Sequence, residues 1–256
     1  GHTFAVGAAI AAKFLKARFG EVMNHTIYTY ISDGGIQEEV SQGAGRIAGH
    51  LGLDNLIMFY DSNNVQLSTY TNSVTSEDVA MKYKAWGWKV MEINGNDVTE
   101  IRTALKEAKK EKEKPTLIIG NTIMGRGAVT DKGQSYENMV DTHGQPLGAT
   151  KASFAATIRN LGGDSENPFV IFDETKALYA KREAQLREIA GEKKAARQVW
   201  ADENPEMAAR LDQFFSGKLP ELDWKSIEQK PNQATRAASA TVLTFLAENV
   251  ENMIVS

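Results

Sequence analysis

Two turns rich in side-chain oxygen atoms are the residues best suited to chemistry in this sequence of 256 residues. Asp33 follows one expected strand, and Asn63 follows the next strand thirty positions later. Ligands of open parallel sheets bind beyond the carboxyl ends of the strands, so these side chains would face each other if their strands are neighbours. A carboxylate, an amide oxygen and a nearby main-chain carbonyl make half of the octahedral oxygen shell that Mg²⁺ prefers.

Two glycines follow the first of these turns. Gly34 and Gly35 open the helix expected after Asp33, and without a Cβ they allow a phosphate to approach the backbone closely. The free N–H groups and the dipole of a helix start favour an anion there. We therefore expect a cation and a helix start to hold a diphosphate together. Each turn alone is ordinary turn chemistry, and only their placement after successive strands favours the functional interpretation.

The elements that would position these turns alternate between strands and helices. Strands are expected at residues 27–31, 56–60, 88–93 and 116–119, and helices at 4–19, 36–51, 76–85 and 98–112. This order predicts an α/β fold, with a doubly wound, mostly parallel sheet flanked by helices. A long loop, of the kind that is functional or disordered, should run from Gly120 to about Gly148. Beyond it we expect helices at 151–161, 173–197, 204–215 and 233–249, a polar irregular segment at 220–231, and a strand at 253–256.

Composition excludes several classes of site. The chain has no cysteine, which rules out disulfides, thiolate metal sites and a cysteine nucleophile. Its net charge of −4 and its lack of a clustered basic stretch argue against nucleic acid binding. Its apolar runs are too short to cross a bilayer and no signal-peptide pattern precedes them, so we expect a soluble, cytoplasmic protein. The chain begins inside an expected helix and ends in an expected strand, which indicates a fragment.

Several stretches resemble the transketolases, a family of thiamine diphosphate enzymes. Ser32-Asp33-Gly34 and Ser62-Asn63-Asn64 resemble the two ends of the motif that these cofactor-dependent enzymes share. Further similar stretches are residues 1–12, 56–68 (LIMFYDSNNVQLS), 80–90 (AMKYKAWGWKV), 115–127 (PTLIIGNTIMGRG) and 141–148 (DTHGQPLG). The resemblance is dense over residues 1–150 and thin beyond them.

The resemblance implies a cofactor site carried by five residues. Asp33, Asn63 and the main-chain carbonyl of Val65 would bind a divalent cation, Mg²⁺ or Ca²⁺. Gly34 would offer its N–H to the diphosphate, and Leu67 would pack against the pyrimidine side of thiamine diphosphate.

The resemblance also implies roles at the substrate and at a subunit interface. His143 would contact the diphosphate and the donor sugar and assist proton transfer, and Arg236 would grip the sugar phosphate with its guanidinium fork. Glu38 would lie at a homodimer interface and couple two cofactors. Two residues depart from the family pattern. Ser32 replaces a glycine, and Gly43 replaces a second interface glutamate, so the coupling would be weakened or rerouted.

These roles imply a domain plan and an activity. Residues 1–200 would form a diphosphate- and metal-binding domain lacking its N-terminal part, 201–232 a linker, and 233–256 the start of a pyrimidine-binding domain. The implied reaction transfers a two-carbon ketol unit from a ketose phosphate to an aldose phosphate in the pentose phosphate pathway. The glutamate that protonates the cofactor's aminopyrimidine belongs to the domain that is cut short, so we expect the chain alone to be inactive.

Other functions remain open at this point. A formaldehyde-using transketolase and deoxyxylulose phosphate synthase use the same cofactor, although residues 80–90 and 141–148 favour transketolase over the latter. A non-catalytic thiamine diphosphate-binding or assembly subunit is a different class. A nucleotide-binding domain is disfavoured because no Walker or dinucleotide glycine pattern follows a strand.

Overall fold

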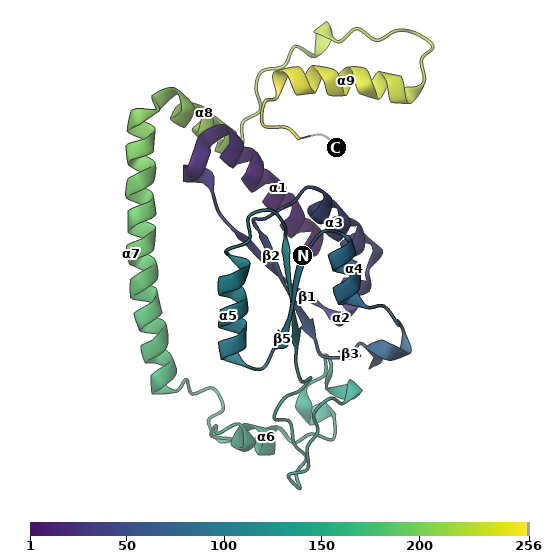
Figure 1. Ribbon diagram of the computed structural model, residues 1–256, viewed down its shortest axis with the longest axis vertical. Coiled ribbons are helices and arrows are strands. Elements are labelled where there is room, and N and C mark those ends of the chain that lie inside the picture. The colour runs from purple at the N-terminus through teal and green to yellow at the C-terminus, as the bar shows by residue number, and fades with distance from the viewer. Residues whose placement is uncertain (255–256) are drawn as a thin grey trace. The chain divides into compact units, whose positions relative to one another are not determined.

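The computed structural model describes residues 1–254 and divides the chain into two compact units (Figure 1). The first unit is Gly1–Leu186, and the second begins at Arg187. This division falls inside one long helix, α7 (Asp173–Glu203). The domain boundaries expected at residues 200 and 232 stay predictions.

A four-stranded parallel sheet forms the centre of the first unit. Its strands lie in the order β1-β2-β6-β5, with bounds β1 Ile27–Ser32, β2 Leu56–Ser62, β6 Thr116–Asn121 and β5 Lys89–Asn94. All four strands were expected from the sequence, and each runs one or two residues further at its carboxyl end than predicted, except β5, which is shifted by one. Because β1 pairs directly with β2, the condition for bringing the two oxygen-rich turns together is met.

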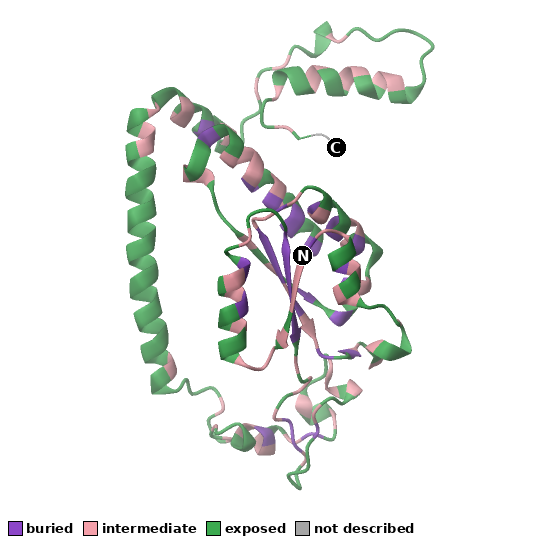
Figure 2. Cartoon of the chain, viewed as in Figure 1, coloured by how far each residue is buried: buried purple, intermediate pink, exposed green. Residues whose placement is uncertain are grey.

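Helices cover both faces of this sheet, as a doubly wound fold requires. One face packs against α1 (His2–Phe19), α3 (Glu39–His50) and α4 (Val79–Ala85), while α5 (Val98–Ala108) packs on the other. Successive side chains of a strand point to opposite faces, so Met58 joins the first core cluster and Ile57 the second. The buried residues, purple in Figure 2, are concentrated in the central strands β2 and β6. The predicted fold class is confirmed.

The expected helix at 36–51 is wrong in one respect: the structure has two helices, α2 (Asp33–Gln37) and α3, separated at Glu38. Glu38 has φ −62° and ψ 128°, which is extended backbone and cannot continue a helix. The side-chain Nε2 of Gln42 donates to the main-chain oxygen of Gln37 at 3.0 Å and so satisfies a carbonyl at the end of α2.

Four other helices have a bound that differs from the prediction by three or more residues. Helix α4 starts at Val79 rather than residue 76, because Asp78 caps it by accepting from the N–H of Met81 at 2.8 Å. Helix α5 stops at Ala108, where tighter turn bonds replace the helical ones. The helix expected at 151–161 is α6 (Phe154–Asn160), and the one expected at 173–197 is α7, which continues to Glu203 just before a proline.

The long loop after β6 is ordered and leads to α6. The hydroxyl of Thr157 in α6 donates to the carbonyl of Val129 and accepts from the N–H of Val129 at 3.1 Å. The side chain of Asn160 donates to the carbonyl of Gly127 at 2.9 Å. A small hairpin, β3 (Val65–Gln66) with β4 (Thr69–Tyr70), follows β2. Short 3-10 helices occupy Gly20–Met23, Thr71–Ser73, Val140–Thr142, Leu147–Ala149 and Trp224–Ser226.

The second unit contains the end of α7, then α8 (Pro205–Phe215) and α9 (Thr235–Asn249). The rings of Trp224 and Phe245 lie 5.9 Å apart, and Arg210 forms an ion pair with Glu251. Of the strand expected at 253–256, the structure shows no strand at 253–254, and 255–256 lie outside the described residues.

Candidate cofactor and cation site

Asp33 and Asn63 meet at the carboxyl ends of β1 and β2. The main-chain N–H of Asn63 donates to Oδ2 of Asp33 at 3.0 Å. Both residues are buried, with Asp33 1% and Asn63 8% exposed. Asn63 in turn accepts from the N–H of Val65 at 3.0 Å through its side-chain oxygen. The structure therefore brings together the three residues expected to bind a cation.

Tyr60 holds the other oxygen of the Asp33 carboxylate. Its hydroxyl donates to Oδ1 at 2.7 Å from the middle of the sheet. Burial, together with the hydrogen bond to Asp33, raises the pKa of Tyr60 far above its ordinary value, so the hydroxyl keeps its proton and acts as the donor. Sequence reasoning missed Tyr60. The available signal was a hydroxyl inside an otherwise apolar strand, because such buried groups have partners.

The Asp33 carboxylate receives only neutral donors in these contacts. Among the described residues, no Lys or Arg forms an ion pair with it. Buried carboxylates in proteins are normally paired with a positive charge or coordinate a metal. No group of three or more His, Cys, Asp or Glu side chains suited to a metal occurs in residues 1–254. One carboxylate with amide and carbonyl oxygens fits a hard divalent cation that completes its shell with phosphate oxygens and water.

The turn after β1 leaves room beside Gly34. A Cβ built on Gly34 would meet no atom within 4 Å, whereas one on Gly35 would lie 3.1 Å from Cγ1 of Ile31. The side chain of Ser32 caps α2 by accepting from the N–H of Gly35 at 3.4 Å, and its φ of −102° needs no glycine. The departure at Ser32 is therefore compatible with the turn, and the exposed backbone of Gly34 is open to a ligand.

Leu67 and His143 line one cavity of about 530 Å³. Leu67 comes from the hairpin turn after Gln66 and is 71% exposed, while His143 comes from the long loop. Nδ1 of His143 is buried without a hydrogen-bond partner in the described structure. Nearby, Tyr136 donates its hydroxyl to Asp141 at 2.8 Å, which ties down the loop that carries His143.

The remaining predicted site residues lie on α3 and α9 or at the junction of α2 and α3. Glu38 is exposed at the junction of α2 and α3, and no hydrogen bond among residues 1–254 links its carboxylate to the Asp33–Asn63 pair. Gly43 is half-buried on α3. Arg236 is exposed near the start of α9, in the second unit.

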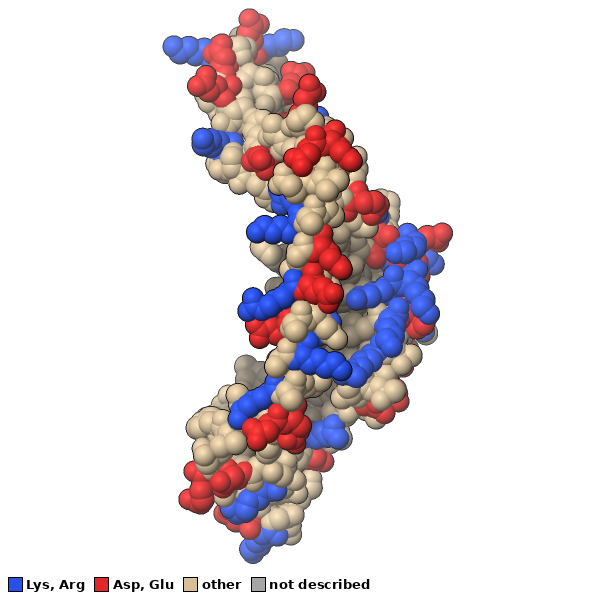
Figure 3. Space-filling model, turned by 90° about the vertical axis from the view of Figure 1, so that its left-hand side faces the viewer, with Lys and Arg blue, Asp and Glu red and all other residues tan. Residues whose placement is uncertain are grey.

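Two further features concern the charged side chains and the apolar character of the helices. Lys and Arg side chains are interspersed with Asp and Glu on the face drawn in Figure 3. In residues 1–254 no helix combines the length and apolar character needed to cross a membrane.

The parallel sheet, with an oxygen-rich pair at the carboxyl ends of two adjacent strands, defines an α/β domain with a candidate cation site at the sheet edge. The family model described as "Transketolase, thiamine diphosphate binding domain" matches residues 1–220. The chain belongs to the transketolase family and carries its thiamine diphosphate-binding domain.

Similar proteins agree with this assignment. The transketolase of Geobacillus stearothermophilus is 35% identical over 266 residues, covering 99% of this chain and 38% of its own length. The chloroplastic transketolase-1 of Arabidopsis thaliana is 35% identical, with 98% and 34% covered. A Pichia stipitis transketolase structure with xylulose 5-phosphate superimposes with a TM-score of 0.84 at 30% identity, covering 98% and 37%. This chain thus spans little more than a third of the length of its relatives.

Proposed function

We propose that the protein carrying this chain is a transketolase that transfers a two-carbon ketol unit from a ketose phosphate to an aldose phosphate. The buried Asp33–Asn63 contact carries this proposal, since it brings together oxygen ligands for a cation that would in turn bind the diphosphate. Related Pichia stipitis structures contain xylulose 5-phosphate and sedoheptulose 7-phosphate, which supports sugar phosphates as substrates.

The residues of this chain would bind and orient the cofactor. Asp33, the side-chain oxygen of Asn63 and the carbonyl of Val65 hold a divalent cation, Mg²⁺ or Ca²⁺, and the N–H of Gly34 donates to the diphosphate. Leu67 packs beside the pyrimidine side of the cofactor. Thiamine diphosphate, when bound, supplies the electron sink for ketol transfer, while the protein supplies binding, orientation and electrostatics.

His143 would act on the substrate side of the same site. Its buried Nδ1 has no partner among the described residues, which leaves the imidazole free to bind a diphosphate oxygen or a sugar hydroxyl and to move a proton. Arg236 would hold the sugar phosphate through a bidentate contact.

The rest of the protein would complete the site. We infer a homodimer with Glu38 at the interface, a diphosphate-binding domain over residues 1–200, a linker over 201–232, and a pyrimidine-binding domain starting at 233. We place the enzyme in the cytoplasmic pentose phosphate pathway and expect the 256-residue chain alone to be inactive.

A coupled assay of the complete protein tests the activity. With thiamine diphosphate and Mg²⁺ present, we expect xylulose 5-phosphate and ribose 5-phosphate to be converted at an enzyme-like rate. Turnover only with formaldehyde as acceptor would favour a formaldehyde transketolase. Cofactor binding without turnover of any sugar phosphate would favour a binding subunit and contradict the proposal.

A further inference from the structure

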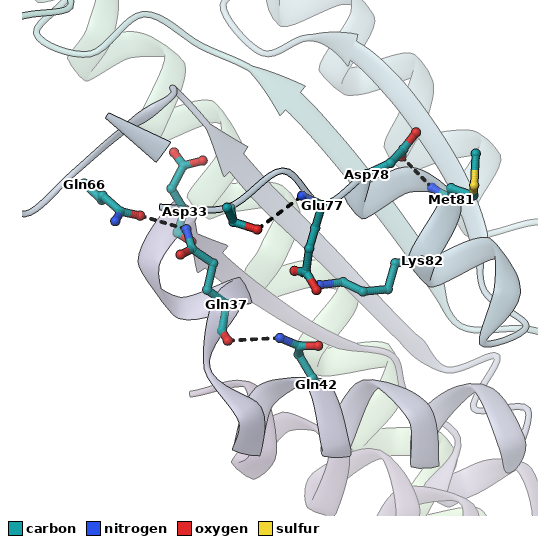
Figure 4. A network of polar contacts seen from close by, with 9 residues as sticks. Asp33, Gln37, Gln42, Gln66, Glu77, Asp78, Met81 and Lys82 are labelled. Atoms are coloured by element: carbon teal, nitrogen blue, oxygen red, sulfur yellow. Dashed lines mark hydrogen bonds and ion pairs between the residues drawn. The ribbon is translucent and has the colours of Figure 1, made fainter. Parts of the chain in front are cut away.

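One glutamine side chain joins the two turns of the cation site (Figure 4). Nε2 of Gln37 donates to the main-chain oxygen of Asp33 at 2.9 Å and to Oε1 of Gln66 at 2.7 Å. A side-chain amide nitrogen carries two hydrogens, so both bonds form at once. Asp33 belongs to the turn after β1 and Gln66 to the hairpin after β2, so Gln37 links segments that are 29 residues apart in sequence.

Gln37 is itself fixed from its other side. Its main-chain oxygen accepts from Nε2 of Gln42 at 3.0 Å, and Gln42 is a buried residue of α3 with 9% exposure. Figure 4 shows Gln37 between Gln66 and Gln42. The link therefore runs from the helix layer, through Gln37, to the hairpin that carries Val65.

Two residues that flank the strand β3 have a positive φ, and the Gln37–Gln66 bond adds a restraint on this segment. Asn64 has φ 63° and Ser68 has φ 70°, both in the left-handed region that non-glycine residues rarely occupy. Such residues persist when their surroundings hold them. The N–H of Thr71 donates to the carbonyl of Asn64 at 3.0 Å. The Gln37–Gln66 side-chain bond ties β3 to α2.

We propose that Gln37 is a positioning residue for the cation, because its amide fixes the Val65 carbonyl relative to the Asp33 carboxylate. The peptide that carries the Val65 carbonyl ends at the nitrogen of Gln66, so holding the Gln66 side chain restrains that peptide. This inference rests on the proposed cation site. Partners that orient metal ligands typically change metal affinity 10- to 100-fold when removed.

The test compares Gln37→Met, Gln66→Met and the double variant in the complete protein. Methionine keeps the length and bulk of glutamine and removes the amide. The measured quantity is the Mg²⁺ concentration that half-saturates thiamine diphosphate binding, followed by tryptophan fluorescence. We expect each single variant to raise it about 10-fold. The double variant should match one single variant, because both changes break the same link. Gln134→Met, at an exposed loop glutamine, is the control and should change nothing.

Four outcomes overturn the proposal. Variants that lose thermal stability or binding amplitude but keep the wild-type half-saturating Mg²⁺ would reduce Gln37 to a structural residue. Additive effects of the two substitutions would show that they do not act through one bond. If the wild-type protein binds the cofactor independently of divalent cations, the cation site fails and this proposal with it. A cation-dependent wild type with unshifted variants overturns the Gln37 role alone.

Discussion

Asn63 donates its main-chain N–H to Oδ2 of Asp33 at 3.0 Å, across thirty residues of sequence and between two adjacent strands. The contact is buried, and Tyr60 donates to the second carboxylate oxygen. Such an arrangement fixes the carboxylate without neutralising it. A bound cation would provide the missing positive charge.

Tyr60→Phe should lower the free energy of unfolding by about 1.5–3 kcal/mol, because it removes a hydrogen bond to a buried charged group. Urea unfolding of the chain would measure the loss. Tyr83→Phe is the matched control, since the Tyr83 hydroxyl is fully buried and has no hydrogen-bond partner within residues 1–254. We expect that control to be neutral or stabilising. Equal losses in both variants would mean that the Asp33 contact contributes nothing.

His2 should make the chain sensitive to acid. Both its ring nitrogens are buried without partners in the described part, and this burial lowers the pKa of His2 to about 4 from 6.5. Between pH 4 and pH 6.5 the His2 imidazole is protonated in the unfolded chain but not in the folded one. The free energy of unfolding therefore falls as the pH drops from 6.5 towards 4. The loss between pH 7 and pH 5 should be about 2 kcal/mol.

His2→Leu should remove this pH dependence and raise stability at pH 7, because it replaces unpartnered polar atoms with an apolar side chain. Urea unfolding at pH 7 and pH 5 measures both effects. His25→Leu, at an exposed histidine, should leave the pH dependence in place. An unchanged slope in the His2 variant would contradict the assignment.

Gly49→Ala should destabilise the first unit by at least about 3 kcal/mol. An added Cβ would lie 1.8 Å from the carbonyl oxygen of Trp86, so α3 and the end of α4 would have to separate. Gly7→Ala is the matched control on the exposed side of α1, where a Cβ meets nothing within 4 Å. Alanine there should stabilise by about 0.5–1 kcal/mol. Thermal unfolding measures the change in stability of both variants. Similar changes in Gly49→Ala and Gly7→Ala would contradict the close approach of α3 to the Trp86 carbonyl.

His143→Ala should reduce turnover of the complete protein about 10²- to 10⁴-fold, the usual range for loss of a proton-transferring group. Cofactor affinity should fall less than turnover, because the proposed cation and the N–H of Gly34 would still hold the diphosphate. Steady-state kinetics and a cofactor titration separate the two quantities. His50→Ala, at an exposed residue that ends α3, serves as the control. Unchanged turnover in His143→Ala would remove this residue from the site.

Much of this fold follows from local sequence patterns. The two central strands β2 and β6 show buried apolar runs, and two oxygen-rich turns after successive strands were enough to place Asp33 beside Asn63. The break at Glu38 was not visible, because Ile36, Val40 and Ala44 continue a helical spacing through it. It is Gln42, bonded across the break to Gln37, that reveals the turn.

Contacts between distant segments account for the other misses. Tyr60 reads as one more apolar strand residue until its hydroxyl is seen against Asp33. Gln37 and Gln66 are polar residues with no local pattern that pairs them. The start of α4 is a local miss: the helix was expected from residue 76, and the hydrogen bond from the N–H of Met81 identifies Asp78 as its cap.

Cofactor titration of the complete protein, with and without Mg²⁺, tests the central claim most directly. Wild type should bind thiamine diphosphate only when the cation is present, and Asp33→Asn should weaken that binding at least about 10-fold. Asp131→Asn, at an exposed loop carboxylate, should bind as wild type does. Cation-dependent binding that survives unchanged in Asp33→Asn would contradict the account, because the cation would then lie somewhere other than between Asp33 and Asn63.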